Sequence, residues 1–317
     1  MNYDVAIQDM LNGEELEGFY ILKDASLKTT ANGKSYLSAS LSDCTGVIDA
    51  KVWDYTGPVG PDDIGKIIKI RATVGEYRGN PQLTIDRIRL TAEDDKFDLA
   101  VLVPCAPINA EKMMDTLRSV VDSIGDPDYR AICDKMLAKY GDKFAEIPAA
   151  KSVHHSFLHG LLMHTFNMLS IATALALQYG DTVNRDLLLT GTLLHDFGKI
   201  KEFDFSEYGL VTDYSTVGQL MGHLVIGAQE VNDVCRELGV PEQKSMLLQH
   251  MILSHHGEPE FGAAVRPLCL EAELLYLIDM LDSRVEIFRE AMQDIPVGTF
   301  SNRIFALDRK IYNHKGE

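Results

Sequence analysis

Gly191-Thr192-Leu193-Leu194-His195-Asp196-Phe197-Gly198-Lys199 is the stretch around which the rest of the chain is organised. Its first four residues are the end of the run 186–194. The side chains of this run are almost all apolar, which predicts a buried helix. A buried carboxylate without a partner is costly, so a His-Asp pair at the end of such a helix requires a metal ion or a proton donor. The sequence predicts a metal site at His195 and Asp196.

Histidines gather on both sides of this pair. Nine of the ten lie between residues 154 and 256, on or beside apolar segments with helical spacing. A lone histidine is usually structural, but several on converging apolar helices can supply imidazole nitrogens to divalent cations, with carboxylates completing the set. The predicted metal ligands are His164, His195, Asp196, His223, His255, His256 and Asp279.

The bulk composition is that of an ordinary globular protein with room for two or three domains. An acidic N-terminus and the absence of an uninterrupted apolar window of about 18 residues argue against a signal peptide and a membrane span. The five cysteines are scattered and never form a C-x-x-C pair, which argues against a disulfide framework and a zinc ribbon. We expect a cytoplasmic protein.

The net charge of −17 is unevenly distributed. Residues 1–90 hold ten Lys and Arg against thirteen Asp and Glu, a balance of −3, which leaves −14 for the rest. Affinity for phosphate backbones depends on cations, so the acidic remainder is not a generic nucleic-acid binder. Binding of single-stranded RNA or DNA should therefore depend on the first ninety residues and on bound metal.

The first ninety residues have the pattern of a small β-barrel. After a lead (5–16) with a helical pattern, apolar residues alternate in five segments separated by turns: 19–22, 36–42, 47–53, 67–74 and 82–90. Such a series of short strands is typical of a closed barrel, which we assign to a domain at residues 1–92.

The outward side of this barrel mixes aromatic and cationic residues. Rings that stack on bases, next to cations that meet phosphates, are what a surface for single strands needs. Packing of the same rings against a second domain is an equally good interpretation. The candidate substrate-binding residues are Tyr36, Lys51, Trp53, Arg71, Tyr77 and Arg78.

Helical periodicity dominates after residue 110. A polar and Pro-containing boundary at 91–110 is followed by amphipathic patterns at 113–124 and 129–140. We therefore expect a connecting segment with helices at 93–150, and an all-α domain with the metal ligands at 151–317. The predicted fold class is multi-domain, a β-barrel followed by an all-α domain.

Two family resemblances fit this division. Residues 18–90, especially Leu41-Ser42-Asp43-x-Thr45-Gly46-x-Ile48-x-Ala50-x-x-Trp53-Asp54, resemble the OB-fold of nucleic-acid-binding proteins. The order His…His-Asp…His…His-His…Asp resembles the HD-domain metal-dependent phosphohydrolases, including the ligands of members that bind two metals. On this resemblance the terminal ligand is Asp279.

Periodicity alone favours a different aspartate. On a helical wheel, Asp282 lies nearer than Asp279 to the centre of the stripe expected to be buried, which is Leu274, Ile278, Leu281, Val285 and Phe288. We follow the resemblance and keep Asp282 as a residue that orients a ligand.

A third resemblance covers nearly the whole chain. Pro148-Ala149-Ala150-Lys151-Ser152-Val153-His154-His155-Ser156, with Gly160-Leu161-Leu162-x-His164-Thr165 and Leu253-Ser254-His255-His256-Gly257, is similar to the YhaM-type 3′-5′ exoribonucleases. This implies stepwise removal of nucleotides from RNA, or from single-stranded DNA. The divalent cofactor expected is manganese, and iron, cobalt, nickel and magnesium are the alternatives. The resemblance places Lys151, His154 and His155 on the substrate side. Leu161-Leu162-Met163 departs from the family, where many members carry an acidic residue.

The ligand set predicts the chemistry. Asp196 can bridge two cations about 3.5–4 Å apart, which together activate a water for in-line attack on phosphorus. Lys199 could hold the phosphate or assist the leaving oxygen; an ordinary solvated lysine is the alternative. We expect the catalytic residues to be Asp196, Lys199 and His195.

Two other functions remain open at this point. The first is a phosphohydrolase of nucleotides or cyclic dinucleotides, with the barrel as a regulatory or assembly module. The second is a non-catalytic nucleic-acid-binding protein with a decayed site. The sequence leaves the oligomeric state open, a homo-oligomer included.

Overall fold

The computed structural model describes residues 2–30, 32–103, 106, 109–150, 157–206, 208–293 and 295–314. Contacts divide the chain into two compact units, one formed by Met1–Cys105 with Phe205–Thr212 and the other by Ala106–Asp204 with Asp213–Glu317. The segment predicted as a connector is thus shared, because residues 93–105 group with the first unit and residues 106–150 with the second.

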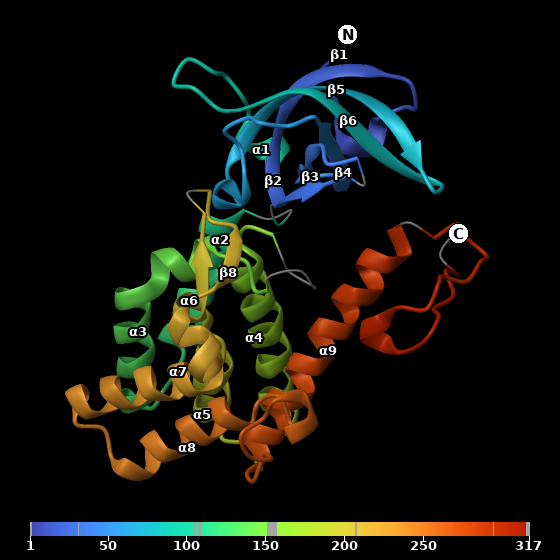
Figure 1. Ribbon diagram of the computed structural model, residues 1–317. Helices are drawn as coiled ribbons and strands as arrows, with labels where there is room; N and C mark the ends of the chain where they lie inside the picture. The colour runs from blue at the N-terminus through green and yellow to red at the C-terminus, as the bar shows by residue number, and fades with distance from the viewer. Residues whose placement is uncertain are drawn as a thin grey trace. The chain divides into compact units, whose positions relative to one another are not determined.

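The first unit contains a closed barrel (Figure 1). Its sheet has the order β1-β2-β3-β4-β6-β5, and β5 also pairs with β2, which closes the ring of five longer strands. All pairs in that ring are antiparallel except β4 with β6, and this is the strand order of an OB-fold. The predicted barrel is confirmed. The strands are β1 (Asn2–Tyr3), β2 (Glu15–Thr29), β3 (Ser35–Ser42), β4 (Val47–Trp53), β5 (Ile67–Tyr77) and β6 (Asn80–Leu90).

One long strand, β2, makes closure possible. Its first half pairs with β5 and its second half with β3, and the register shifts between Leu22 and Asp24. A bulge of this kind bends a strand and raises its twist, so one strand can serve both sides of the barrel. The sequence had predicted only residues 19–22 of this strand. The lead is not helical either, apart from a 3-10 turn at Ile7–Asp9.

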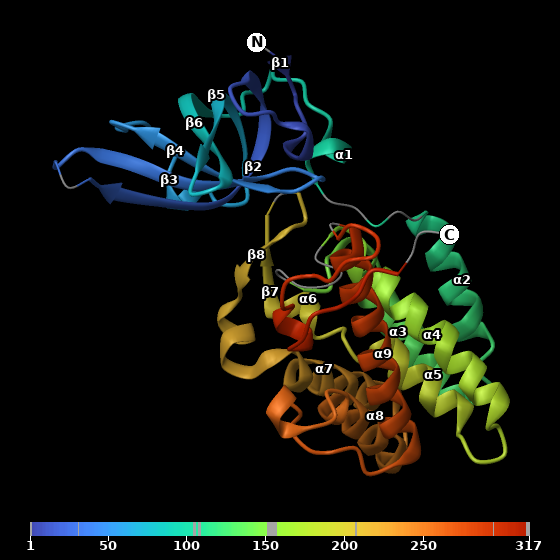
Figure 2. The ribbon, with the colours of Figure 1, turned by 90° about the vertical axis from the view of Figure 1, so that its right-hand side faces the viewer.

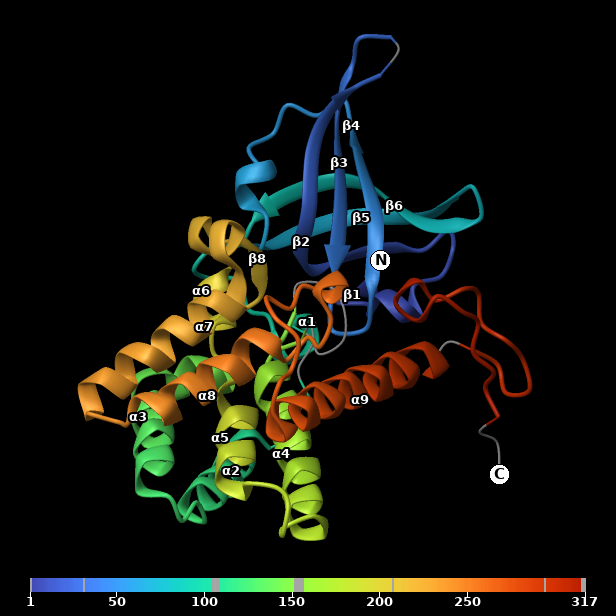
Figure 3. The same cartoon turned by 90° about the horizontal axis from the view of Figure 1, so that it is seen from below.

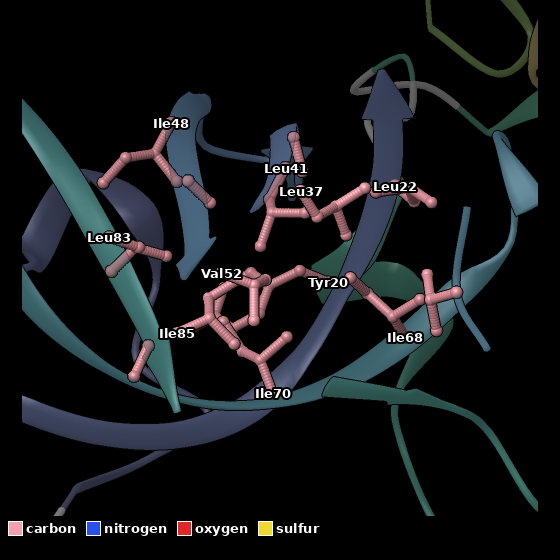
Figure 4. Close-up of a cluster of buried hydrophobic side chains, with 14 of the residues drawn as sticks. Tyr20, Leu22, Leu37, Leu41, Ile48, Val52, Ile68, Ile70, Leu83 and Ile85 are labelled. Carbon is pink, nitrogen blue, oxygen red and sulfur yellow. The ribbon is translucent and has the colours of Figure 1, made fainter. Parts of the chain in front are cut away.

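Alternate side chains of the strands fill the barrel, as Figure 4 shows. The predicted inward residues of β3 and β4 are all buried: Leu37, Ala39, Leu41, Ile48, Ala50 and Val52. Burying each large aliphatic side chain contributes about 1.5–3 kcal/mol, which fixes the register and leaves the opposite face to solvent. The core therefore determines which residues point outward.

The second unit is built of helices around α4 (Figures 2 and 3). The helix α4 packs against α2, α3, α5 and α9, and α7 packs against α3, α6 and α8. Side-chain caps begin four of them, at Asn109, Asp126, Asn184 and Ser215. The helices are α2 (Ala110–Asp122), α3 (Pro127–Glu146), α4 (Gly160–Gln178), α5 (Arg185–Leu194), α6 (Lys199–Glu202), α7 (Thr216–Leu238), α8 (Glu242–Ser254) and α9 (Leu270–Gln293); α1 (Leu99–Leu102) belongs to the first unit.

Two features of this part of the chain were not anticipated from the sequence. A two-stranded sheet, β7 (Phe203–Phe205) with β8 (Val211–Tyr214), interrupts the helices. In addition, α4 is long and apolar enough to cross a membrane, but 56% of its most apolar window is buried among its neighbours, as in a core helix.

Candidate metal centre

Five helices bring every predicted metal ligand to one place. Among the residues that the structure describes, two groups have ligand atoms within 4.8 Å of one another. The first group contains His164 of α4 with His195 and Asp196, which follow α5. The second contains His223 of α7 with His255 and His256, which follow α8. Both groups are buried, although His256 is less so.

Asp196, a member of the first group, also faces the second. Its Oδ2 is 3.3 Å from Nε2 of His195 and 3.9 Å from Nε2 of His164. Its Oδ1 is 3.5 Å from Nε2 of His223 and 3.6 Å from Nε2 of His255. Each carboxylate oxygen therefore faces a different group, which is the arrangement that a bridging ligand requires.

The two aspartates of α9 occupy different positions. Oδ1 of Asp279 is 3.3 Å from Nε2 of His164, on the side of the ring that faces Asp196. Oδ2 of Asp282 is 2.7 Å from Nδ1 on the opposite side of the same ring, and Asn167 donates to its Oδ1 at 3.1 Å. This geometry supports Asp279 as the ligand and Asp282 as the residue that orients His164.

The helical wheel correctly ranked Asp282 as more buried than Asp279, with side chains 7% and 18% exposed, but part of the stripe behind it was wrong. Leu281 and Val285, which it placed in the buried stripe, are 49% and 48% exposed. The buried face of α9 instead includes the charged residues Glu271, Asp282 and Glu286. Because these are held by hydrogen bonds or ion pairs, apolarity alone could not identify that face.

Backbone carbonyls fix the orientation of two of the imidazole rings. Nδ1 of His195 donates to the carbonyl of Thr192 at 2.8 Å, and Nδ1 of His255 donates to that of Ile252 at 2.7 Å. A carbonyl can only accept, so both rings carry a proton on Nδ1 and turn Nε2 toward the site. Such partners fix the tautomer of a metal-binding histidine.

Unsatisfied polar atoms test whether cations fit this site. Six buried side-chain atoms have no hydrogen-bond partner among the described residues. Two are the hydroxyls of Thr165 and Thr192, and the other four belong to predicted ligands: His195 Nε2, Asp196 Oδ1, His223 Nε2 and His256 Nδ1. Buried polar atoms are almost always paired, so four such atoms at one site need an explanation. Imidazole nitrogens and carboxylate oxygens around one space are the donor set of divalent transition ions, so the residues fit such ions.

Protonation states agree with this assignment. Burial raises the pKa of the Asp196 carboxyl, but Lys199 and His195 outweigh it and hold that pKa well below its usual value. Burial and the neighbouring His195 hold the pKa of His255 well below its usual value, and burial lowers that of His256. Both imidazoles are therefore neutral at pH 7, which is the form that binds a metal.

His164 differs from the other rings. Burial lowers its pKa, but hydrogen bonds to Asp279 and Asp282 raise it to about 9. This imidazole carries a proton at pH 7, and a cation bound by His164 and Asp279 would have to replace it.

Lys199 is not an ordinary solvated lysine. Its Nζ donates to Asp196 Oδ2 at 2.7 Å, and its side chain is 16% exposed. The ammonium group therefore lies beside the proposed bridging carboxylate.

Sequence reasoning missed Glu202 and Gly222. Glu202 Oε1 is 3.0 Å from Nδ1 of His223 and also accepts from the amide of His223 at 3.0 Å. Gly222 has φ 69° and ψ 158° in the middle of α7, a conformation that essentially only glycine adopts. A glycine directly before a candidate ligand, inside a helical pattern, was the available signal. Glu202 gave none.

Replacing Gly222 tests the importance of this break in α7. We expect Gly222→Ala to lower the free energy of unfolding by about 1–3 kcal/mol, because alanine is strained at this φ and ψ. Chemical denaturation of both proteins measures the change. Gly141→Ala is the control: Gly141 is helical with open space where a Cβ would lie, so alanine there should be neutral or stabilising by up to about 1 kcal/mol. Equal effects of the two changes would contradict the prediction.

The predicted substrate-binding residues of the barrel lie in two places. Tyr36 and Trp53 are paired across β3 and β4 with ring centroids 5.0 Å apart, and Lys51 Nζ lies 5.9 Å from the Tyr36 ring. Trp53 and Arg71 both line a groove of about 650 Å³. Tyr77 and Arg78 lie instead at the β5–β6 turn, with the Arg78 guanidinium 5.3 Å from the Tyr77 ring.

The groove has more cations than the sequence pattern indicated. Arg87 also lines it, directly across the ladder from Arg71, and neither makes an ion pair with any described residue. Lys69 and Arg89 line it too but are paired with Glu17 and Asp95. Lys151, His154 and His155 lie outside the described residues.

Comparisons with known proteins agree with both halves of the chain. Residues 161–284 match the model of the HD domain. Curated proteins called "3′-5′ exoribonuclease YhaM" are similar over nearly the full length: that of Oceanobacillus iheyensis is 35% identical, covering 95% of this chain and 94% of the relative. That of Listeria welshimeri is 36% identical, covering 95% and 96%.

Among solved structures, the barrel is similar to the second OB-fold domain of replication protein A from Methanococcus maripaludis. The identity is 15% and the TM-score 0.22, with 30% of this chain and 99% of that chain covered.

Proposed function

This chain belongs to the YhaM family of 3′-5′ exoribonucleases and is a metal-dependent hydrolase of phosphodiester bonds, and we propose that it shortens single-stranded RNA, or single-stranded DNA, using two divalent ions. The observation that carries the two-ion proposal is the position of Asp196 between two groups of buried ligand atoms, four of which lack a partner among the described residues. We also propose that the enzyme acts in the cytoplasm.

We assign one ion to each group. His164, His195 and Asp279 would hold the first, and His223, His255 and His256 the second, with one oxygen of Asp196 for each. When bound, the pair of ions supplies an activated water and takes up charge on the phosphate oxygens. A mixed imidazole and carboxylate set suits manganese, which we expect first, and also iron, cobalt, nickel or magnesium.

The protein's own residues supply charged groups and imidazole rings of fixed orientation. Asp196 is anionic, since its pKa is well below the usual value, and Lys199 beside it is cationic because Asp196 outweighs the effect of burial on its pKa. When Asp196 binds the cations, Lys199 would be free to donate a hydrogen bond to a phosphate oxygen of the substrate. His195 and His255 keep fixed rings because the carbonyls that hold them belong to the last turns of their own helices.

The barrel would hold the single strand. Tyr36 and Trp53 present two neighbouring rings, and Arg71 and Arg87, which make no ion pair with a described residue, place two guanidinium groups along the groove. Stacking on rings tolerates any base, so this surface suits a nuclease without strong sequence preference. Cations in the barrel would also offset repulsion between RNA and the acidic remainder of the chain.

A second candidate is a phosphohydrolase of nucleotides or cyclic dinucleotides, with the barrel as a regulatory or assembly module. The balance of −14 outside residues 1–90 favours it, because a small substrate needs no long cationic path.

Digestion of labelled RNA tests the proposal. With Mn²⁺, a single-stranded RNA labelled at its 5′ end should give a ladder that shortens one nucleotide at a time. Chelation should stop the reaction, and added Mn²⁺ should restore it, because the ligands remain but the ions do not. The same RNA labelled at its 3′ end should release labelled mononucleotide from the start, which distinguishes exonuclease from endonuclease.

Two results would contradict this proposal. One is the absence of a ladder under all metals tried. The other is release of linear dinucleotide or phosphate, from cyclic dinucleotides or nucleotides, at rates far above RNA cleavage; that result would favour the second candidate.

A further inference from the structure

The four buried histidines of the site are supported in two different ways. His195 and His255 are held by backbone carbonyls one turn earlier in their own helices. His164 and His223 are instead held by carboxylates from other helices, Asp282 and Glu202. Each group of ligands therefore contains one ring fixed locally and one ring whose orientation depends on a distant carboxylate.

Glu202 fixes more than the ring of His223. The break at Gly222 makes His223 the start of the second half of α7, and amides at a helix start have no acceptor within the helix. Glu202 Oε1 accepts from this amide at 3.0 Å and lies 3.0 Å from Nδ1. One oxygen thus fixes both the backbone and the ring, and Nε2 points toward Oδ1 of Asp196, 3.5 Å away.

Glu202 is itself held in place by close packing. A Cβ at Gly218 would lie 2.0 Å from the carbonyl oxygen of Glu202, and a Cβ at Gly198 would lie 2.1 Å from that of His223. Ser215 also donates from its amide to the Glu202 carbonyl at 2.9 Å. The backbones of α6 and α7 therefore approach as closely as only glycine permits, and the Glu202 side chain is 8% exposed.

A polar cluster anchors the rest of α6. Lys201 donates to Glu230 of α7, which also accepts from Lys139 at 2.9 Å and from the hydroxyl of Tyr140. Burial raises the pKa of Glu230, but these three donors hold it at about 2. Glu230 is therefore anionic at pH 7, and its contacts tie α6 to α3 and α7, so Glu202 has little freedom to move.

We propose that Glu202 is the positioning residue for the second ion: it sets the affinity of the site formed by His223, His255 and His256, while Asp282 does the same for the His164 side. This inference rests on the proposed two-ion site. A carboxylate behind a metal-binding imidazole fixes its orientation and raises its basicity, and its removal typically costs about 10–100-fold in metal affinity.

Manganese titration of variants tests this directly. Glu202→Gln keeps the size of the side chain but loses the charge, and it should raise the dissociation constant of one of two Mn²⁺ ions by about 10–100-fold, as measured by calorimetry. The spectroscopic signal of coupled Mn²⁺ ions should disappear at Mn²⁺ concentrations that fill the wild-type protein. Glu237→Gln is the control, because Glu237 lies on α7 with a side chain 60% exposed.

Double variants identify which ion is affected. Glu202→Gln should have no effect on the ion that remains in His255→Ala, but it should still weaken the ion that remains in Asp279→Ala. Asp282→Asn should show the opposite pattern. Glu202→Asp keeps the charge but shortens the side chain by one methylene, so it should also weaken the second ion selectively. If Glu202→Gln does not fold, Glu202→Asp tests the role of Glu202 in its place.

Two outcomes would overturn the inference. Glu202→Gln could bind both ions with wild-type affinity, or it could weaken the ion that remains in His255→Ala. Neither outcome depends on nuclease activity. A wild-type protein that binds two ions but gives no RNA ladder would instead count against the proposed function alone.

Discussion

Asp196→Asn is expected to lower the rate of nucleotide removal by about 10³-fold or more, the scale on which loss of a group that organises a catalytic site acts. Asparagine has the same shape but no charge, and only one of its two terminal atoms can bind a cation. In the native chain each oxygen of Asp196 faces a different group of histidines, so the substitution should remove a ligand from one group and the charge from both. It also removes the anionic partner of Lys199.

Single-turnover digestion of 5′-labelled RNA at saturating Mn²⁺ measures this loss. Asp233→Asn is the control, since Asp233 is exposed on α7, away from the ligands, and should leave the rate unchanged. Binding of single-stranded RNA should also be unchanged in Asp196→Asn, because the proposed binding surface is in the barrel. A rate within about tenfold of wild type would contradict the role of Asp196 as the shared ligand.

The candidate ligands could be picked out in the sequence because they break a local rule. His195 and Asp196 are polar residues at the end of an apolar helix, and both are buried in the structure. The barrel was predictable for a related reason: alternation in β3 and β4 separates inward from outward residues, and a shift by one residue would expose the whole apolar set.

What the sequence could not predict depends on partners distant along the chain. Glu202 is ordinary in sequence and acquires its role only when His223, 21 positions later, is brought to it. Part of the buried face of α9 was misjudged because it contains charged residues, and Asp282 among them is satisfied by His164 of another helix. The sequence of α9 alone does not contain the partners of Glu271 and Asp282, which lie elsewhere in the chain.

The second large effect is expected in the barrel. Trp53→Ala should weaken binding of single-stranded RNA by about 1–3 kcal/mol, which corresponds to roughly 5–150-fold in the dissociation constant. Trp53 is 51% exposed, lies against Tyr36 and lines the same groove as Arg71 and Arg87, so a base could stack on it while a phosphate meets one of the two arginines. Fluorescence anisotropy with labelled single strands measures the change.

Matched variants separate stacking from folding. Trp53→Phe keeps a ring and should retain most of the affinity, whereas Tyr3→Ala removes an aromatic ring that is 69% exposed on β1 and should have no effect. Hydrolysis of a dinucleotide should be unaffected by Trp53→Ala, since the substrate is too short to need the barrel. If Trp53→Ala slowed dinucleotide hydrolysis as much as that of long RNA, Trp53 would support the fold rather than the substrate. The combination of weaker RNA binding and unchanged dinucleotide hydrolysis is what a barrel that holds the strand, and helices that cut it, must produce.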